Sequence, residues 1–257
     1  MKGTETNLQL QDDIIYGPIH SRRLGWSLGV NILGTVQKLC SMNCIYCQYG
    51  WTPQTVHELT SADVPGRQQI LSSLKSFLAG SPSPIDYVTI AGNGEPTLHP
   101  QFAEIVGGIV GLLHRLRPAT KLALLSNGLH CSDRSIRTAL AKIDLAIMKL
   151  DAGTEKTFQR LNNPANGFTL ENTVVGLQQL KRCVLQTMLV EGVVDNTREE
   201  ELQGLVQMLK RIKPLHLQIY SIAREPASSK VRKVEFRRLK ELAMILEKES
   251  GVETLVY

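Results

Sequence analysis

The segment Tyr87-Val88-Thr89-Ile90-Ala91-Gly92-Asn93-Gly94-Glu95-Pro96 contains the unit from which the chain is built. Its first five residues are a short apolar run rich in β-branched side chains, which is typical of a buried strand. The glycines that follow indicate a turn. A helical pattern comes next, near residues 101–116. A strand that leads through a polar turn into a helix predicts one βα unit of a parallel sheet.

The same unit recurs on both sides of this segment. The expected strands are residues 27–32, 87–91, 122–126, 145–150, 186–190 and 216–220. The expected helices lie near residues 63–78, 101–116, 132–142, 170–182, 198–212 and 235–249. The alternation predicts an α/β fold with a mostly parallel sheet, and six units suit an incomplete barrel better than a closed one. We expect a single domain over residues 14–257 after a flexible N-terminal arm at 1–13, while 252–257 fits either an edge strand or a lid.

The composition is that of a globular protein of 257 residues, with 42% hydrophobic residues and a net charge of +5. No stretch approaches the roughly 18 apolar residues of a membrane span. The polar N-terminus lacks the apolar centre of an export signal. Five cysteines, three of them clustered, do not form a disulfide framework. A reducing cytoplasmic location is therefore expected, and the mild positive charge permits a polyanionic partner without requiring one.

The clustered cysteines form the run Cys40-Ser41-Met42-Asn43-Cys44-Ile45-Tyr46-Cys47, directly after the first expected strand. A 4Fe-4S cluster is usually held by four cysteines. Three cysteines leave one iron with an open position, as in catalytic metal sites. An alternative is a zinc site completed by a distant residue. The candidates for that fourth ligand are His57, Cys131 and Cys183.

The turn Gly92-Asn93-Gly94-Glu95 ends the second expected strand. Free N–H groups of such a turn can bind a carboxylate, and Glu95 can pair with an ammonium group. A ligand that carries both groups is an amino acid, so methionine could chelate the open iron while Glu95 holds its amine. The alternative is an ordinary turn at the end of a strand.

These motifs together resemble the radical S-adenosyl-L-methionine (SAM) superfamily. The cysteine run matches its C-x3-C-x-aromatic-C signature, and Gly92-Asn93-Gly94-Glu95 is similar to its Gly-Gly-Glu motif. The resemblance implies a (β/α)6 partial TIM barrel, with three irons bound by Cys40, Cys44 and Cys47 and the fourth chelated by SAM. It also implies further SAM contacts from Tyr46 against the adenine and from Ser126 and Asn127 at the ribose or methionine.

A narrower group, the wyosine-base tRNA-modifying enzymes, has a similar opening, Tyr16-Gly17-Pro18 followed by Ser21-Arg22-Arg23-Leu24-Gly25. The segments 94–99, 126–128 and 150–152 fit the same group, and Arg224-Glu225-Pro226 is close to its Arg-Pro pair. No cysteine precedes Cys40, so the second cluster of those enzymes is predicted to be absent. That absence argues against their pyruvate-condensing reaction.

The resemblance implies that an electron donor such as flavodoxin or ferredoxin reduces the cluster, which cleaves SAM to methionine and a 5′-deoxyadenosyl radical. The radical would abstract hydrogen from tRNA or a nucleotide-like small molecule. Two alternatives remain open. One is an activase that acts on a partner protein, as glycyl-radical activases do, and the other is a non-catalytic iron–sulfur or zinc binding module.

The substrate side is less defined. Lys149 and Asp151 share one face at the end of their strand, as a substrate pair or as an ordinary ion pair. Gln218 and Tyr220 share a face of the sixth strand, and Arg224 follows it. Arg22 and Arg23 suit a phosphate or carboxylate, or they pin the N-terminal arm. The basic residues at 230–240 could follow an RNA backbone or form a solvated helix face.

Overall fold

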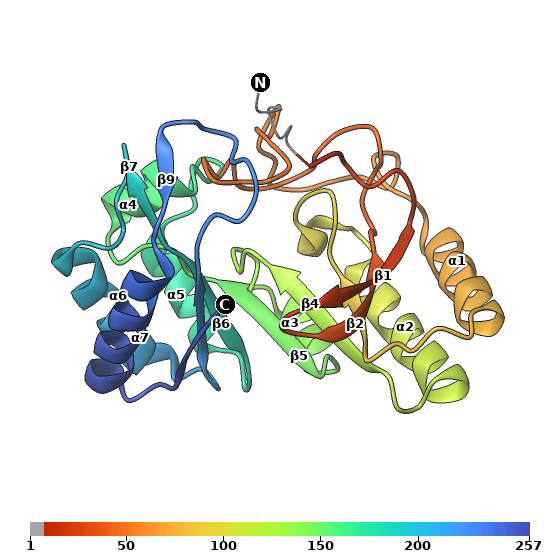
Figure 1. Cartoon of the computed structure of the whole chain (residues 1–257). Coiled ribbons are helices and arrows are strands. Elements are labelled where there is room, and N and C mark those ends of the chain that lie inside the picture. Colours follow the sequence, from red (N-terminus) through yellow and green to blue (C-terminus); the bar gives the residue numbers. More distant parts are fainter. Residues whose placement is uncertain (1–7) are drawn as a thin grey trace, which may run out of the picture.

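The computed structural model describes residues 8–257, and its centre is an eight-stranded sheet in the order β1-β2-β3-β4-β5-β6-β8-β10. The strands are β1 (Ile15–Ser21), β2 (Gly25–Val30), β3 (Tyr87–Ile90), β4 (Lys121–Ser126), β5 (Leu145–Lys149), β6 (Val184–Met188), β8 (Leu217–Tyr220) and β10 (Thr254–Val256). Only β1 is antiparallel to its neighbour. The sheet curves and stays open between β1 and β10, which confirms the predicted partial barrel (Figure 1).

Helices cover the outer face of this sheet. They are α1 (Arg67–Gly80), α2 (Phe102–Leu116), α3 (Arg134–Leu140), α4 (Glu155–Leu161), α5 (Leu170–Gln178), α6 (Glu199–Ile212) and α7 (Phe236–Ser250), with a short 3-10 turn, η1 (Pro96–Leu98). In Figure 1, α1 and α2 lie outside the right-hand part of the curved sheet, and α6 and α7 lie outside its left-hand part. Because β3, β4 and β5 are largely buried on both faces, their sequences are almost unbroken apolar runs.

The inner face of the sheet carries a small apolar cluster. Leu24, in the turn between β1 and β2, packs there against Ala123, Ile147 and Val184. The larger cluster lies between the strands and the helices and includes Ile90, Ile105 and Leu124. Side chains alternate along a strand, so Lys149 shares the inner face with Ile147, and Gln186 shares it with Val184.

Several boundaries differ from the expected ones. The strand β1 was not predicted, because Gly17 and Pro18 interrupt its pattern. Helix α1 begins at Arg67 rather than near residue 63, since Pro65 and Gly66 end the preceding loop. The antiparallel pair β7 (Val190–Gly192) and β9 (Val231–Lys233) forms a second small sheet that the alternation did not reveal. Residues 254–256 form the edge strand β10, which decides between the two readings of the C-terminal segment.

Part of the predicted N-terminal arm, residues 1–7, lies outside the described residues. The remainder contacts the loop between β2 and α1: Leu8 N donates to Gln48 O over 2.8 Å, and Gln11 Nε2 donates to Tyr49 Oη over 3.1 Å. Within residues 8–257, no helix is both long enough and apolar enough to cross a membrane.

Candidate active site

The three cysteines of the run lie on one loop, residues 31–66, that leaves the carboxyl end of β2. This loop passes above the sheet in Figure 1. Cys40, Cys44 and Cys47 are all partly buried free thiols, and Cys47 N donates to Cys44 O over 3.1 Å in a tight turn. Active sites of parallel α/β folds lie at this end of the strands. The loop therefore presents its thiols where the fold favours a ligand.

The surroundings of these sulfurs fit a positively charged metal centre. Burial, followed by the neighbouring Cys47 and Asp151, raises the pKa of Cys44 to about 11. Burial also raises the pKa of Cys40. N–H groups nevertheless point at the sulfurs, from Met42 N to Cys40 Sγ over 3.4 Å and from Asn162 Nδ2 to Cys44 Sγ over 3.5 Å. Such donors favour the thiolate form of the cysteines. Burial alone disfavours these negative charges, and the positively charged irons of a cluster would stabilise them.

The zinc alternative finds no support in the geometry. Across residues 8–257, no three His, Cys, Asp or Glu side chains converge closely enough to hold one metal ion. His57 instead stacks on Phe168, with ring centroids 5.2 Å apart. Cys131 and Cys183 are buried in the main core. Three thiolates of an iron–sulfur cube bind three different irons, so they need not converge on a single point.

The glycine turn is locked to the cysteine loop. Leu39 N donates to Asn93 O and Glu95 N donates to Leu39 O, each over 2.9 Å. Gly94 has a φ of +143°, and a Cβ on it would lie 1.7 Å from Leu39 O. Only glycine therefore permits this close approach. The loop and the turn form one backbone unit.

The side chain of Asn93 has a structural role in this unit. It is fully buried, and its Oδ1 accepts from Gln11 N over 2.7 Å. Its Nδ2 donates to Gln11 O over 2.8 Å and to Gly34 O over 3.1 Å. Asn93 thus ties the chain at residue 11 to the cysteine loop. Its backbone is also occupied, because its N–H donates to Asn31 Oδ1 over 3.3 Å and its carbonyl accepts from Leu39 N.

Glu95, which follows β3, meets Ser126 and Asn127 at the end of β4. The Glu95 carboxylate is only 2% exposed. Its Oε1 accepts from Ser126 Oγ over 2.8 Å and from Thr97 N over 3.0 Å, and its Oε2 accepts from Asn127 N over 2.6 Å. A carboxylate oxygen can accept two hydrogen bonds, so Oε2 retains capacity for one further donor.

Asn127 also contacts the cysteine loop. Its Nδ2 donates to Ser41 Oγ over 2.9 Å, and its Oδ1 accepts from Leu129 N over 3.1 Å. The residue after Cys40 is thereby held against the end of β4. The three segments that the sequence proposes for a cofactor site thus form one hydrogen-bonded group.

Lys149 and Asp151 form an ion pair at the end of β5, with Nζ and Oδ1 2.9 Å apart. The Asp151 side chain is fully buried and that of Lys149 is 17% exposed. Asp151 Oδ1 also accepts from Met188 N over 2.7 Å. Its other oxygen accepts hydrogen bonds from Tyr46 Oη and, over 2.8 Å, from Asn162 Nδ2. Burial lowers the pKa of Lys149, but Asp151 and Tyr220 outweigh that effect and raise it above its ordinary value. Lys149 is therefore held as a cation.

Tyr46 joins the cysteine loop to this ion pair. Burial and the nearby Asp151 raise its pKa well above the ordinary value, so its hydroxyl stays protonated and donates a hydrogen bond to Asp151 Oδ2. Lys149 Nζ donates in turn to Tyr220 Oη over 2.9 Å. The polar chain from Tyr46 to Tyr220 follows the inner face of the sheet.

Asn162 is a site residue that the sequence analysis missed. It is 1% exposed, and its Nδ2 lies within hydrogen-bond distance of Cys44 Sγ and Asp151 Oδ2. Its Oδ1 is buried and has no hydrogen-bond partner within residues 8–257. The Asn162-Asn163-Pro164 sequence at the end of α4 was the available signal, because such residues often end helices.

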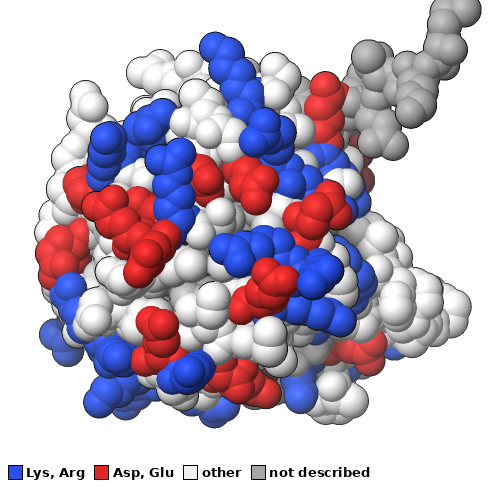
Figure 2. Space-filling model, turned by 60° about the vertical axis from the view of Figure 1, so that its left-hand side comes forward, with Lys and Arg blue, Asp and Glu red and all other residues white. Residues whose placement is uncertain are grey.

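Arg224 lies apart from the Lys149–Asp151 pair. It comes from the loop after β8, and its guanidinium donates to Gln48 Oε1 over 2.8 Å. This contact places it beside the cysteine loop, one residue beyond Cys47. The basic residues at 230–240 are largely exposed, and Arg237 and Arg238 both pair with Glu241. Figure 2 shows acidic side chains among the basic ones on this side of the molecule.

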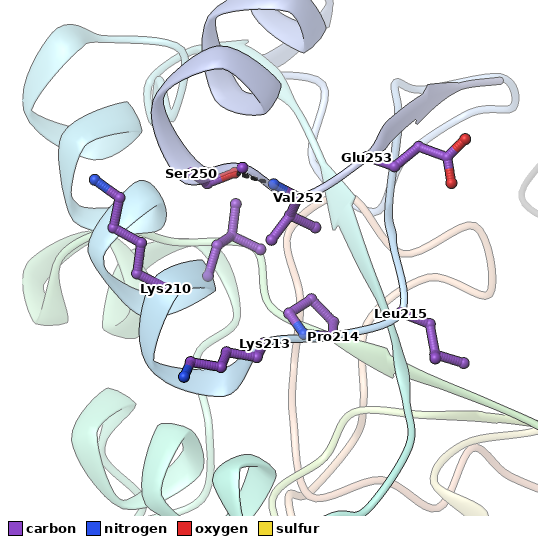
Figure 3. Close-up of a pocket in the computed structure, with 9 residues that line it drawn as sticks. Lys210, Lys213, Pro214, Leu215, Ser250, Val252 and Glu253 are labelled. Carbon is purple, nitrogen blue, oxygen red and sulfur yellow. Dashed lines mark hydrogen bonds between the residues drawn. The ribbon is translucent and has the colours of Figure 1, made fainter.

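A cavity of about 500 Å³ lies at the opposite end of the strands (Figure 3). Its lining includes Lys210, Lys213 and Leu215 before β8, and Val252 and Glu253 before β10. Those residues precede their strands, whereas the cysteine loop follows one. The cavity is therefore separate from the candidate site.

The sequence is similar to several curated proteins, while no protein-family model matches it. It is 30% identical over 241 residues to a UPF0026 protein of Helicobacter pylori strain J99, covering 91% of this chain and 74% of that protein. It is 32% identical over 213 residues to a UPF0026 protein of Synechocystis, covering 80% and 74%. It is also 28% identical over 256 residues to a protein named GTPase Obg of Brachyspira hyodysenteriae, covering 97% of this chain but only 36% of that protein.

Solved structures show the same fold at low sequence identity. A radical SAM methyltransferase from Sphaerobacter thermophilus has a TM-score of 0.65 and 16% identity, covering 90% of this chain and 65% of that one. The structure of TYW1 with a lysine-pyruvate adduct has a TM-score of 0.61 and 18% identity, covering 87% and 74%. The partial barrel of this chain is therefore the fold of radical SAM enzymes.

Proposed function

The chain belongs to the UPF0026 family, and from that premise we propose that it is a radical SAM enzyme. The observation that carries the proposal is the attachment of the three-cysteine loop to the turn that bears Glu95. Leu39 and Gly94 hold the two backbones together, and Glu95 N donates to Leu39 O over 2.9 Å. A buried carboxylate with remaining acceptor capacity thus stands beside a set of three thiols. Three thiolates would hold a cluster with one open iron, and the carboxylate could accept a hydrogen bond from the amine of a ligand bound at that iron.

Each residue then has a separate task. Cys40, Cys44 and Cys47 would hold a 4Fe-4S cluster, while the Gly92–Glu95 turn, Ser126 and Asn127 would hold SAM. When bound, the two groups supply reductive cleavage of SAM to a 5′-deoxyadenosyl radical. Glu95 orients the amine, since its carboxylate is fixed by Ser126 and Asn127 N. Tyr46, buried against Asp151, would keep water from the adenine side of the site.

Lys149, Asp151 and Arg224 form the proposed substrate side. The ion pair fixes Lys149 on the inner face, and Arg224 borders the cysteine loop. Substrates of the proposed class are tRNA or a nucleotide-like small molecule, and flavodoxin or ferredoxin is the proposed reductant. The substrate class follows the resemblance to the wyosine-base enzymes. We propose a cytoplasmic setting from the cysteine usage, and one catalytic domain over 14–257 from the continuous series of βα units.

A lysine–pyruvate adduct of the kind named for TYW1 is not part of this proposal. Such an adduct needs a neutral amine as nucleophile. Asp151 lies 2.9 Å from Lys149 Nζ, and Asp151 and Tyr220 raise the pKa of Lys149, which favours its charged form. We therefore assign Lys149 an electrostatic role toward the substrate.

Anaerobic reconstitution tests the proposal. The protein is loaded with iron and sulfide, reduced with dithionite and given SAM, and 5′-deoxyadenosine is quantified by mass spectrometry. The Cys40→Ala/Cys44→Ala/Cys47→Ala variant should make none, whereas Cys131→Ala, a matched control in the core, should keep the activity. A loaded wild-type protein that neither binds nor cleaves SAM would refute the proposal.

A further inference from the structure

Arg23 lies on the inner face of the sheet rather than against the N-terminal arm. It belongs to the turn between β1 and β2, and the adjacent Leu24 anchors this turn on Ala123, Ile147 and Val184. The guanidinium carbon lies 4.4 Å from the ring centroid of Tyr220 and 5.2 Å from that of Tyr257. The turn and the two rings therefore fix this arginine in place.

The Arg23 side chain has no hydrogen bond or ion pair with any of residues 8–257. Arginine carries five N–H donors, and contact with an aromatic face leaves those donors free. The side chain is only partly exposed, and burial is the main cause that lowers its pKa. A half-buried guanidinium with free donors is ready to bind an acceptor.

The neighbouring groups leave an excess of positive charge here. Lys149 Nζ lies 4.8 Å from the centroid of the same Tyr220 ring, and its charge is balanced by Asp151. Gln186 and Gln218 share this face and are hydrogen-bonded to each other over 3.1 Å. Gln218 also contacts His216 Nε2 over 3.2 Å, and burial lowers the pKa of His216, which favours its neutral form. In this group of side chains, Lys149 has a carboxylate partner and Arg23 has none within residues 8–257.

We propose that Arg23 binds the carboxylate or phosphate group of a small anionic substrate on the inner face of the sheet. The guanidinium fork matches both groups, each of which can accept two parallel hydrogen bonds. The inference rests on the proposed function, because a chain of contacts through Tyr46, Asp151, Lys149 and Tyr220 leads from the cysteine loop to Arg23. The substrate would place its anionic end at Arg23 and its reacting end toward the loop.

A small molecule fits this position better than a folded RNA. Arg23 is on the inner face, whereas the exposed basic residues available to an RNA backbone are partly neutralised, as Arg237 and Arg238 are by Glu241. The recognition chemistry is therefore that of a single carboxylate or phosphate bound by a guanidinium that lies against two aromatic rings.

Arginine side-chain NMR tests this site on the full chain. Inorganic phosphate and acetate are titrated separately into protein labelled with ¹⁵N-arginine, and the Nε–H signal of Arg23 is followed at constant ionic strength. We expect a saturable shift of that signal, with the stronger titrant identifying the substrate's anionic group. Binding to the variants is followed by backbone amide shifts of the β1–β2 turn in uniformly ¹⁵N-labelled protein. Arg23→Gln should weaken it by about tenfold or more and Arg23→Lys by less. Arg22 is an exposed neighbour of the same charge, and Arg22→Gln should leave binding unchanged.

The anion site is refuted if neither titrant shifts the Arg23 signal, or if Arg22→Gln weakens binding as much as Arg23→Gln. If Arg23→Gln does not fold, the titrations of the wild type and of Arg22→Gln still test the anion site, because both proteins retain the Arg23 Nε–H signal. Cleavage of SAM is measured separately on the same wild-type protein. A saturable Arg23 shift without SAM cleavage would refute the proposed reaction and retain the anion site, whereas cleavage without any shift would refute the anion site alone.

Discussion

The backbone N–H of Asn127 donates to the Glu95 carboxylate over 2.6 Å, so the end of β4 holds the side chain at the end of β3. Ser126 Oγ reinforces this contact from the same strand end. The carboxylate is thereby oriented before any ligand arrives. Preorganised acceptors of this kind bind an ammonium group without the cost of ordering a free side chain.

Glu95→Gln removes the negative charge of the carboxylate while keeping the shape of the side chain. We expect the affinity for SAM to fall by about tenfold or more, since hydrogen bonds to charged groups contribute roughly 1.5–3 kcal/mol. Calorimetric titration of SAM into the reconstituted protein measures the change. Glu104→Gln on the exposed side of α2 is the control and should bind SAM as the wild type does. Equal SAM affinities in the wild type and both variants would show that Glu95 does not contribute to SAM binding.

Gly94→Ala tests the junction between the turn and the cysteine loop. Its Cβ would lie 1.7 Å from Leu39 O, so the two backbones must separate. We expect a loss of more than about 2 kcal/mol in the free energy of unfolding, together with poor cluster loading. Gly111→Ala is the matched control, because its Cβ meets no atom within 4 Å. It should be neutral or stabilising by up to about 1 kcal/mol. Urea denaturation measures both, and similar values would contradict the locked junction.

Asp151→Asn should be strongly destabilising, because it leaves Lys149 as a buried cation without its counter-ion. Breaking a buried pair typically costs about 3–5 kcal/mol. Lys149→Met alone should also destabilise the fold, and the double variant should recover part of the loss. A double-mutant cycle of unfolding free energies measures the coupling between the two residues. Strictly additive effects would show that the ion pair contributes nothing beyond its separate members.

Asn162→Ala removes the N–H donor to Cys44 Sγ. Hydrogen bonds to cluster sulfurs stabilise the more negative, reduced state, so we expect a more negative reduction potential in the reconstituted variant. A redox titration followed by electron paramagnetic resonance measures it. Asn172→Ala, at an exposed position of α5, should leave the potential unchanged. An unaltered potential in Asn162→Ala would limit Asn162 to a structural role at Asp151.

Stability should fall as the pH decreases below about 6.5. Burial lowers the pKa of His99, whose Nε2 lies 3.0 Å from Pro65 O and whose Nδ1 accepts from Gln101 N over 3.0 Å. A histidine whose folded-state pKa lies below its unfolded value near 6.5 binds fewer protons in the folded protein than in the unfolded one. Its contribution to stability is therefore complete above pH 6.5 and is lost as the pH falls through the folded-state pKa. Urea midpoints from pH 8 to pH 5 measure this loss.

His99→Gln should reduce that pH dependence. Burial also lowers the pKa values of His130 and His216, so part of the slope will remain. The exposed His114 on α2 provides the control, and His114→Gln should retain the full wild-type slope. Identical slopes in the two variants would exclude His99 as a source of the effect.

The fold and much of the site could be predicted from the sequence because both depend on local pattern. Apolar runs such as residues 87–90 specify buried strands wherever they pack, and the spacing of Cys40, Cys44 and Cys47 is fixed within one loop. Parallel strands place their carboxyl ends together, so Glu95, Ser126 and Asn127 could be expected to lie on one edge.

Only the tertiary structure decided which side chains face one another across the barrel. Asn162 reaches Cys44 from a position 118 residues away, and Arg23 reaches Tyr220 from a turn whose sequence equally fitted a link to the N-terminal arm. Such contacts depend on sheet curvature and register, which bring distant strands and loops onto one inner face. Local periodicity predicts which face of the sheet a side chain occupies. It does not predict which side chain the curvature of the sheet places opposite to it.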